Sequence, residues 1–438
     1  MKKIYLVVLL ASFCIGNAQI NWKRSVSGSN APSWFTTTAG NTERGIAALN
    51  DKVYVSSRKS GNVIKEIDGT TGNDIQDILC PAAVVTGGAI VLNDVEVSTN
   101  GAILACNVTT ATNTSAFKIY KWDTATATPT VYINYTNTDP NENLRLGDFF
   151  SVTGDISTNA VILAAGRVGS TSNYKVVRWI VTAGTPGAPT VITIPTLTTA
   201  TTFISAAPLT NSATPEFIVK AAGNTLTKHN ADGTLTGETI VNTVIPTSAS
   251  DSRYFEVGVK KYLVSYFYGT SNEYAKLVDV TDGFATASTV AVTPILGTVT
   301  NGNAAGGIGL KLVPDLVDGI ANTITVYTLG CNNGISGTTL VKDGVTVVLG
   351  NNDFSAAQAH KATKIFPNPA ANEFYIAIDT DVEKDAQALI YDIQGRQVKT
   401  VKIDASIQRV SIQDLNAGEY LVKIINGKNN NTAKLLKK

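Results

Sequence analysis

The octapeptide Lys65-Glu66-Ile67-Asp68-Gly69-Thr70-Thr71-Gly72 ends an apolar and charged stretch in a tight Asp-Gly turn. Similar stretches recur as Tyr120-Lys121-Trp122-Asp123-Thr124, Lys228-His229-Asn230-Ala231-Asp232-Gly233 and Lys276-Leu277-Val278-Asp279-Val280-Thr281-Asp282-Gly283. Asp and Gly suit such turns because Asp hydrogen-bonds its own backbone and Gly readily adopts positive φ. Each stretch therefore predicts the third strand of a repeated β unit.

The opening strands of these units are expected at intervals of about fifty residues. They begin near Glu43, Leu92, Arg145, Phe203, Arg253 and Asn303, which are 49, 53, 58, 50 and 50 residues apart. Four short strands and their turns fill such an interval, as in a β-propeller blade. A propeller hides its first and last edges, so residues 20–35 are expected to supply a closing strand or a partial seventh blade. The spacing favours six blades over seven, and a solenoid of stacked β-turns is the other architecture considered.

The composition of the 438-residue chain is that of an all-β protein with little catalytic material. It has 44% hydrophobic and 16% charged residues, 36 Gly and one Met, which argues against a helical bundle. A net charge of +1 gives no basis for binding nucleic acid. The sequence has two His and lacks a P-loop, a dinucleotide-binding motif and His-Glu-x-x-His, so no cofactor is predicted.

The first 18 residues read as a secretory signal peptide. Lys2 and Lys3 precede an apolar run at 4–15 and a small-residue stretch, which predicts cleavage near Ala18. A transmembrane anchor needs about 20 apolar residues, so none is expected, and Cys14 would leave with the signal. The remaining cysteines, Cys80, Cys106 and Cys331, could form one disulfide and one thiol, but buried free thiols in strands are favoured.

The composition changes after the central region. A propeller domain at 19–354 is followed by a polar, Ala-rich linker at 355–363 and a final segment at 364–438. Its strands are expected at 374–378, 388–392, 398–403, 408–412 and 418–425. Alternating apolar and charged residues in this segment predict half-buried strands in a small immunoglobulin-like β-sandwich.

Four motifs follow one another in this final segment. They are Phe366-Pro367-Asn368-Pro369, Ile390-Tyr391-Asp392-Ile393-Gln394-Gly395-Arg396-Gln397-Val398, Leu415-Asn416-Ala417-Gly418-Glu419-Tyr420-Leu421-Val422 and Lys434-Leu435-Leu436-Lys437-Lys438. The two prolines favour an extended start that cannot pair as a central strand. Gly395 is expected in a hairpin turn beside Asp392 and Arg396, and Gly418 is expected to begin a strand with Tyr420 on its core face.

In this order the motifs resemble the C-terminal sorting domain of the type IX (Por) secretion system, in its type A form. The resemblance implies general secretory export, then delivery to the outside or the outer-membrane surface, with the type IX machinery as partner. In the family such tails are commonly removed as the cargo is released or attached to surface lipopolysaccharide. An ordinary adhesive sandwich is the alternative. The central region loosely resembles uncharacterised secreted β-propeller proteins, which implies no residue-level function.

Charged residues gather where the innermost strands are expected to begin. In a propeller these positions lie near one mouth of the central channel, where several blades converge. The candidate ligand-binding residues are Glu43, Arg44, Asp94, Arg145, Asp148 and Arg253. Convergent carboxylate and guanidinium groups predict binding of an extracellular glycan or peptide. Arg–carboxylate pairs that only tie blades together are the structural alternative.

Two other functional classes stay open at this point. Paired carboxylates at about 5–5.5 Å or about 6.5–9.5 Å would suit an extracellular carbohydrate-active enzyme, and peptide cleavage is considered with it. The other class is a structural surface-layer component without a selective small ligand. His229 lies beside a turn and His360 in the linker, where both are expected to be solvated rather than catalytic.

One acidic loop suggests calcium but lacks the residues of an EF-hand. Asp139, Asn141 and Asn143 have the initial spacing, whereas Leu144 stands where Gly is required and Phe150 where a bidentate Glu is required. The loop is expected to be a solvated turn, with weakly bound calcium as the alternative. No other metal site is predicted.

Overall fold

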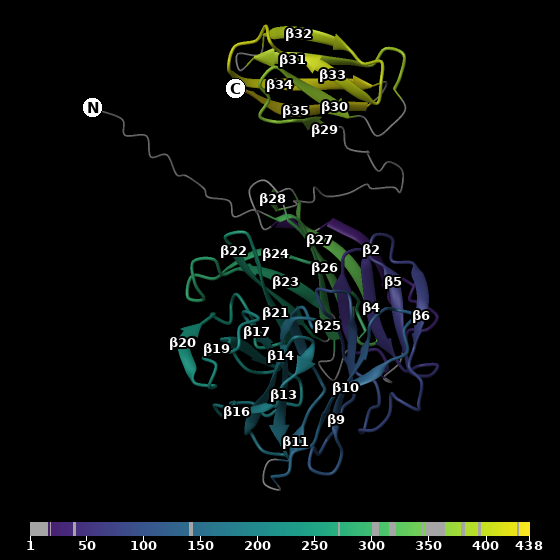
Figure 1. The fold of residues 1–438 in the computed structure, drawn as a ribbon, viewed down its shortest axis with the longest axis vertical. Helices are drawn as coiled ribbons and strands as arrows, with labels where there is room; N and C mark the ends of the chain where they lie inside the picture. The colour runs from purple at the N-terminus through teal and green to yellow at the C-terminus, as the bar shows by residue number, and fades with distance from the viewer. Residues whose placement is uncertain are drawn as a thin grey trace, which may run out of the picture. The chain divides into compact units, whose positions relative to one another are not determined.

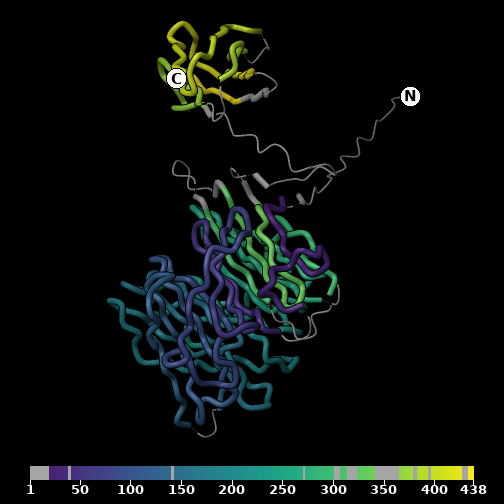
Figure 2. Tube along the Cα trace, turned by 90° about the vertical axis from the view of Figure 1, so that its right-hand side faces the viewer, coloured from purple at the N-terminus to yellow at the C-terminus, as the bar shows by residue number. Residues whose placement is uncertain are grey.

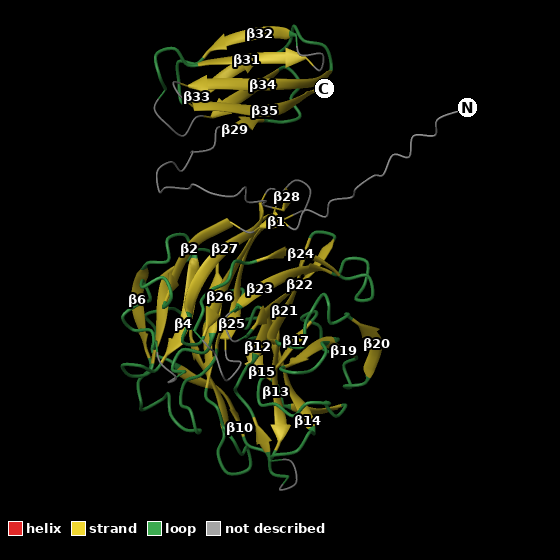
Figure 3. Cartoon of the chain, turned by 180° about the vertical axis from the view of Figure 1, so that it is seen from behind, coloured by secondary structure: helices red, strands yellow, loops and turns green. Residues whose placement is uncertain are grey.

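The computed structural model describes residues 16–17, 19–37, 41–139, 143–269, 272–299, 306–314, 321–342, 345–346, 364–377, 382–392, 396–426 and 429–438. Every regular element in these ranges is a β-strand (Figure 3). The chain divides into two compact units, Met1–Gly350 and Asn351–Lys438. Apart from Gly16 and Asn17, the expected signal peptide lies outside the described residues, as do the linker, His360 and Gly395.

The described strands of the first unit form six successive sheets (Figure 1). The first sheet contains β3 (Ile46–Leu49), β4 (Lys52–Ser57), β5 (Val63–Asp68) and β6 (Asp74–Leu79). The second contains β7 (Val95–Val97), β8 (Ile103–Cys106), β9 (Phe117–Trp122) and β10 (Thr130–Tyr135). The third contains β11 (Leu144–Arg145), β12 (Ser151–Gly154), β13 (Asn159–Val168), β14 (Tyr174–Thr182), β15 (Thr185–Pro186) and β16 (Thr190–Ile194).

The remaining three sheets of this unit complete the series. The fourth sheet contains β17 (Ile204–Pro208), β18 (Phe217–Ala221), β19 (Thr227–His229) and β20 (Leu235–Thr239). The fifth contains β21 (Ala249–Val257), β22 (Lys260–Phe267), β23 (Tyr274–Asp279), β24 (Ser288–Val292) and β1 (Gly16–Asn17). The sixth contains β25 (Gly306–Pro314), β26 (Ala321–Gly330), β27 (Gly334–Lys342), β28 (Val345–Thr346) and β2 (Gln19–Ser25). All pairings within the six sheets are antiparallel except that of β1 with β24.

The six sheets close into a ring. The inner strand of each sheet lies beside the inner strands of its two neighbours, in the cyclic order β3, β7, β12, β17, β21, β25 and back to β3. This arrangement confirms the β-propeller prediction, and the described residues supply six blades. The recurring Asp-Gly turns follow third strands as predicted, at the ends of β5, β19 and β23.

The hydrophobic core is divided among the six junctions between neighbouring blades. One buried cluster, for example, joins Leu104 and Phe117 of the second sheet to Ile162 and Trp179 of the third. Clusters of the same kind fill the other five junctions, including the one between the sixth sheet and the first. Apolar burial therefore stabilises each blade through its neighbours.

The ring is closed by β2, a strand close to the N-terminus. β2 pairs antiparallel with β27, so residues more than 300 positions apart in sequence share one sheet (Figure 2). This pairing covers the outer edge of the sixth sheet, where unpaired backbone groups would otherwise be exposed. Of the two roles considered for residues 20–35, the structure shows the closing strand rather than a seventh blade.

Trp22 of β2 also fastens the sixth sheet to the first. Its indole Nε1 donates to Gly69 O (2.8 Å), and its ring lies 6.0 Å from that of Tyr327, centroid to centroid. A Cβ atom at Gly72 or Gly337 would lie 2.6 or 2.7 Å from the indole. The two glycines therefore leave the space that this large side chain needs.

The second unit is a two-sheet β-sandwich in its described residues. One sheet has β29 (Lys364–Phe366), β30 (Glu373–Ala377) and β33 (Ile407–Ser411), and the other has β31 (Gln387–Asp392), β32 (Gln397–Lys402), β34 (Gly418–Asn426) and β35 (Asn429–Lys437). Buried residues of both sheets, among them Phe374 and Val422, share one core. The five predicted strands are present, and the immunoglobulin-like topology stays a prediction.

The first and last motifs of this unit are joined by hydrogen bonds. Asn368 Nδ2 donates to Lys434 O (2.6 Å), and Leu436 N donates to Asn368 Oδ1 (2.9 Å). Tyr420 lies in the core as expected, and its hydroxyl donates to Asn416 O (2.8 Å). Asn368, between the two prolines, thus links the first motif to β35.

His229 does not lie in solvent, contrary to the expectation from sequence. His229 is buried, stacks on Phe217 with a 5.2 Å centroid separation, and hydrogen-bonds through both ring nitrogens. It is therefore a core residue rather than a solvated one, because β19 turns its side chain inward.

Cys80, Cys106 and Cys331 are free thiols, and Cys106 and Cys331 are buried.

We predict that Trp22→Ala lowers the free energy of unfolding of the first unit by about 3–5 kcal/mol, because it leaves a cavity and removes the bond to Gly69. Denaturant unfolding of the full chain can be followed by tryptophan fluorescence, since all four tryptophans lie in this unit. Ile20→Ala, at an exposed position of the same strand, is the control. Equal losses in the two variants would contradict the closing role of Trp22.

Candidate functional site

The channel through the ring is occupied by an ion pair between opposite blades. Glu96 of β7, in the second sheet, pairs with Arg253 of β21, in the fifth. In a ring of six these two blades face each other across the axis. Arg253 Nη1 also lies 2.9 Å from Asp251 Oδ1. A cavity of about 150 Å³ lies beside the pair and is lined by residues of all six inner strands.

Asp94 and Asp251 bind backbone amides of the next blade. Phe150 N donates to Asp94 Oδ2 (2.9 Å), and Ile308 N donates to Asp251 Oδ2 (3.3 Å). Val95 N donates to the other oxygen of Asp94 (3.0 Å). These carboxylates therefore tie neighbouring blades together, which is the structural alternative considered for the charged residues.

Burial dominates the electrostatics of this cluster. It raises the pKa of Asp94 to about 7, and it raises the pKa values of Glu96 and Asp251 as well. Burial alone would lower the pKa of Arg253, but the surrounding carboxylates raise it. The guanidinium thus stays charged while the carboxylates compete for its single positive charge.

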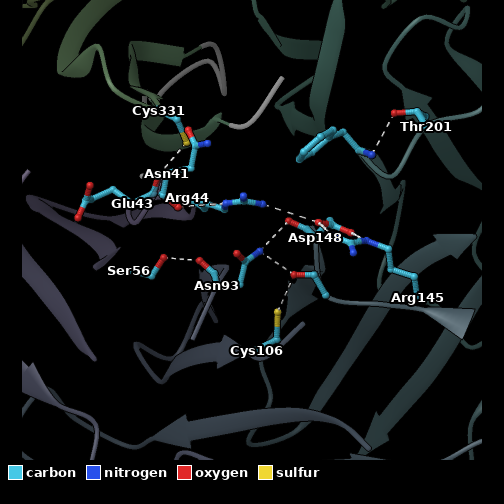
Figure 4. A network of polar contacts seen from close by, with 12 residues as sticks. Asn41, Glu43, Arg44, Ser56, Asn93, Cys106, Arg145, Asp148, Thr201 and Cys331 are labelled. Atoms are coloured by element: carbon cyan, nitrogen blue, oxygen red, sulfur yellow. Dashed lines mark hydrogen bonds and ion pairs between the residues drawn. The ribbon is translucent and has the colours of Figure 1, made fainter. Parts of the chain in front are cut away.

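A second polar group lies where the inner strands begin. We call this group the N-terminal mouth. Its residues are Asn41, Arg44, Arg58, Asn93, Arg145, Asp148, Phe203 and Asn332. Arg145 binds Asp148 with both ends of its fork, Nε to Oδ2 at 2.6 Å and Nη2 to Oδ1 at 2.8 Å (Figure 4). This hydrogen-bonded contact raises the pKa of Arg145.

Arg44 approaches the same carboxylate without a hydrogen bond. Its Nη1 lies 3.9 Å from Asp148 Oδ1, and its guanidinium carbon lies 5.9 Å from the centre of the Phe203 ring. Its Nε donates to Asn41 O at 3.3 Å. Among the described residues, neither terminal nitrogen of Arg44 has a hydrogen-bond acceptor, and its side chain is only 15% exposed.

A second guanidinium, that of Arg58, shares the carbonyl of Asn41. Arg58 Nη2 donates to Asn41 O (2.6 Å), and Asn332 Nδ2 donates to Asn41 Oδ1 (3.0 Å). Burial, and then repulsion from Arg44, lowers the pKa of Arg58. The backbone of Asn41 therefore holds two arginines close together at this mouth.

Asn93 contributes a buried acceptor. Its Nδ2 donates to Gly147 O (2.8 Å) and Asp148 O (3.3 Å), which fixes the orientation of the amide. Its Oδ1 is buried and has no hydrogen-bond partner within the described chain. Figure 4 shows the Asn93 side chain directed toward Arg44 and Asp148.

The candidate residues chosen from sequence thus fall into three places. Arg44, Arg145 and Asp148 meet at the N-terminal mouth, and Asp94 and Arg253 lie in the channel cluster. Glu43 is buried and accepts from Thr36 N (2.9 Å) and Ser57 Oγ (2.7 Å), so its carboxylate serves the packing of the first sheet. Ligand binding by any of the six stays a prediction.

Sequence reasoning missed five residues of the mouth: Asn41, Arg58, Asn93, Phe203 and Asn332. Asn93 directly precedes Asp94, and Phe203 marks the start of a predicted blade, so their positions were visible in the repeat. Arg58 follows β4 and Asn332 follows β26, and no local pattern places them beside Arg44.

Larger cavities lie away from the channel residues. One of about 690 Å³ is lined by residues of the third and fourth sheets, including Lys175, Thr193 and Asp232. In the second unit, a cavity of about 530 Å³ is lined by Asp392, Arg396, Gly418 and Tyr420, among other residues. The second and third sequence motifs of that unit therefore meet at one cavity.

The described residues contain no group of three or more His, Cys, Asp or Glu side chains arranged to hold a metal ion. The loop considered for calcium, 138–148, lies partly outside the described residues. Weak calcium binding there stays a prediction. The described part of the chain contains no helix long and apolar enough to cross a membrane.

We predict that Arg253→Met destabilises the propeller by about 3–5 kcal/mol, because it leaves Glu96 and Asp251 buried without a cation. Adding Glu96→Met should restore part of that loss, since it removes one of the stranded carboxylates. Equilibrium unfolding of the single variants and the double variant, followed by tryptophan fluorescence, measures the coupling. Additive losses would show that the two side chains do not interact across the channel.

The raised pKa values predict a pH dependence of stability. A carboxylate with a raised pKa in the folded state contributes stability below its unfolded pKa near 4, and this contribution is lost as the pH rises through the folded value, about 7 for Asp94. As the pH rises from 4 to 8, the free energy of unfolding of Asp94→Asn should therefore increase by a few kcal/mol relative to that of the wild type. Chemical unfolding at several pH values measures the difference. Asp77→Asn, on the exposed strand β6, is the control and should show no such trend.

Comparison with solved structures relates the first unit to known folds. A DUF4623 family protein from Bacteroides eggerthii is 19% identical, with 74% of this chain and 76% of that chain covered and a TM-score of 0.59. An α-L-arabinanase of Penicillium chrysogenum in complex with arabinobiose is 11% identical, covers 74% and 98%, and has a TM-score of 0.45. The six-bladed β-propeller lectin of Aleuria aurantia is 12% identical, covers 72% and 99%, and has a TM-score of 0.40.

Family comparisons distinguish the two units. Residues 35–212 match a domain of unknown function (DUF8500), and residues 364–438 match the secretion system C-terminal sorting domain. No functionally curated protein matches the chain. The second match covers all four sequence motifs and confirms the resemblance drawn from them. Residues 364–438 are thus a type IX secretion C-terminal sorting domain, and the chain is an exported protein whose first unit is a β-propeller.

Proposed function

We propose that this exported protein is a noncatalytic binding protein whose propeller recognises an extracellular glycan or peptide at the N-terminal mouth. The observation that carries the proposal is that the carboxylates and Arg44 differ in how fully they are hydrogen-bonded. The described carboxylates of the channel and the mouth already have partners, whereas Arg44 keeps unused donors beside an aromatic ring. A ligand acceptor would complete the hydrogen bonding of this arginine.

The donors of Arg44 favour recognition because of their geometry. A guanidinium presents planar N–H groups that suit two-point contacts with oxygen atoms of a ligand. Arg145 holds Asp148 at both oxygens and so limits its competition for Arg44. The Phe203 ring supports the guanidinium from one side. Such a prepared donor costs little ordering when a ligand arrives.

The enzyme alternative has weaker support from the same residues. A glycosidase of the usual kind needs an acid and a second carboxylate on either side of the scissile bond. Asp148 is held by Arg145, Glu96 by Arg253, and Asp94 by backbone amides. For peptide cleavage, Cys106 and Cys331 are buried thiols with raised pKa values.

The proposed export route adds detail to what the sorting domain implies. A signal peptide at 1–18 would direct the general secretory step, and cleavage near Ala18 would free a chain that begins at β2. The proposed boundaries are then a propeller at 19–354, a linker at 355–363 and the sorting domain at 364–438. Binding on the outer surface or in the medium would follow.

A screen of the full chain against glycans and peptides tests the proposed function. Saturable binding is expected, and Arg44→Ala should weaken it at least tenfold because the unused donors are lost. Arg145→Ala should also weaken it, since Asp148 would be free to pair with Arg44. Affinity is measured by isothermal titration, with turnover followed in the same samples.

Lys175→Ala, in the 690 Å³ cavity, is the matched control and should bind as the wild type does. Loss of binding in this variant alone would move the site to that cavity. Product formation would place the protein among enzymes, and no binding across a broad panel would contradict the proposal.

A further inference from the structure

We infer that the N-terminal mouth selects a carboxylate carried on a sugar ring, as in uronic-acid saccharides. This inference rests on the proposed function and names the ligand chemistry of the same site. It follows from three features of the mouth: two guanidinium groups that no described carboxylate hydrogen-bonds, the unused donor edge of Arg44, and buried side-chain oxygens that lack donors.

The charges around the mouth leave guanidinium groups without a bound carboxylate. Three carboxylates, Glu43, Asp148 and Glu273, lie near Arg44, Arg58 and Arg145. Glu43 accepts hydrogen bonds from Thr36 N and Ser57 Oγ, and Asp148 is bound at both oxygens by Arg145. Arg44 and Arg58 therefore carry positive charge that no described carboxylate hydrogen-bonds.

The placement of these two arginines favours an anion over a neutral group. Both donate to the carbonyl of Asn41, which holds them close enough for Arg44 to lower the pKa of Arg58. An anionic ligand would relieve this repulsion. A carboxylate fits the two terminal nitrogens of Arg44 in the bidentate manner typical of arginine. Partial burial of the mouth strengthens such a contact relative to bulk water.

The buried oxygens indicate that the ligand also carries hydrogen-bond donors. Asn93 Oδ1 and Asn332 Oδ1 are both buried without a partner among the described residues. A buried polar group that lacks a hydrogen-bond partner is unfavourable, so a ligand that supplies a donor is favoured. Hydroxyl groups of a sugar could reach these oxygens directly or through a bridging water.

This combination distinguishes a uronic acid from an acidic peptide. A sugar ring holds its carboxylate and several hydroxyl donors on one rigid frame. An aspartate or glutamate side chain ends in a carboxylate with no hydroxyl group beside it. The donor and acceptor pattern of the mouth therefore matches the saccharide better.

The test compares oligosaccharides of galacturonic, glucuronic, mannuronic and guluronic acid with their methyl esters, using the full chain. The ester keeps the sugar and its stereochemistry but removes the negative charge. At least one acid form should bind saturably and at least tenfold more tightly than its ester. Arg44→Gln should remove this preference, Arg44→Lys should retain part of it, and Lys175→Gln should leave it unchanged. Thermal unfolding followed by tryptophan fluorescence checks that each variant is folded.

Each other outcome overturns a different statement. Equal binding of acid and ester would refute selection of a carboxylate while leaving glycan binding intact. Binding of a triglutamate peptide, with no acidic saccharide bound, would assign the site to peptides. If no uronic saccharide binds but the wider screen finds another ligand, only this inference fails. If the wider screen finds nothing, the proposed function fails with it.

Discussion

The pairing of β2 with β27 is the constraint on which the propeller depends. Each blade buries its apolar faces only against its neighbours, so an open series would leave two faces and one strand edge in water. The indole of Trp22 carries this closure across to the first sheet through Gly69 and Gly72. The positions of the inner strands, and of every side chain at the channel, follow from this closed ring.

Charge is distributed unevenly along the axis of the ring. Inside the channel, Arg253 serves several buried carboxylates, and the backbone amides of neighbouring blades satisfy the rest. At the mouth it is guanidinium groups that lack a charged hydrogen-bond partner. Arg145 binds both oxygens of Asp148, whereas neither Arg44 nor Arg58 has a hydrogen-bonded carboxylate. The charged groups inside the channel thus link the blades to one another, and the proposed ligand-binding residues lie only at the end where the inner strands begin.

Sequence patterns located the repeat better than the site. Asp68-Gly69 and Asp232-Gly233 marked third strands because local turn chemistry determines them, whereas β14 has no such turn and its sheet was inferred from spacing alone. Charges at strand starts identified Arg44, Arg145 and Asp148 correctly as neighbours. They did not show that Glu43 turns away from Arg44, nor that Glu96 reaches Arg253, 157 positions along the chain. Such long-range contacts are set by ring geometry, which no local pattern encodes.

The direction of the closing pair has a mechanical consequence. Gln19, at the start of β2, lies opposite Thr339, and Ser25 lies opposite Gly334 at the start of β27. The N-terminal end of β2 and the C-terminal end of β27 therefore lie at the same end of the sheet, where β28 also pairs with β27. A pull applied to both strand ends would break the backbone hydrogen bonds between β2 and β27 one at a time rather than shearing them all at once. The ring should therefore resist heat and denaturant through all its blades, yet open under modest tension on these two strand ends.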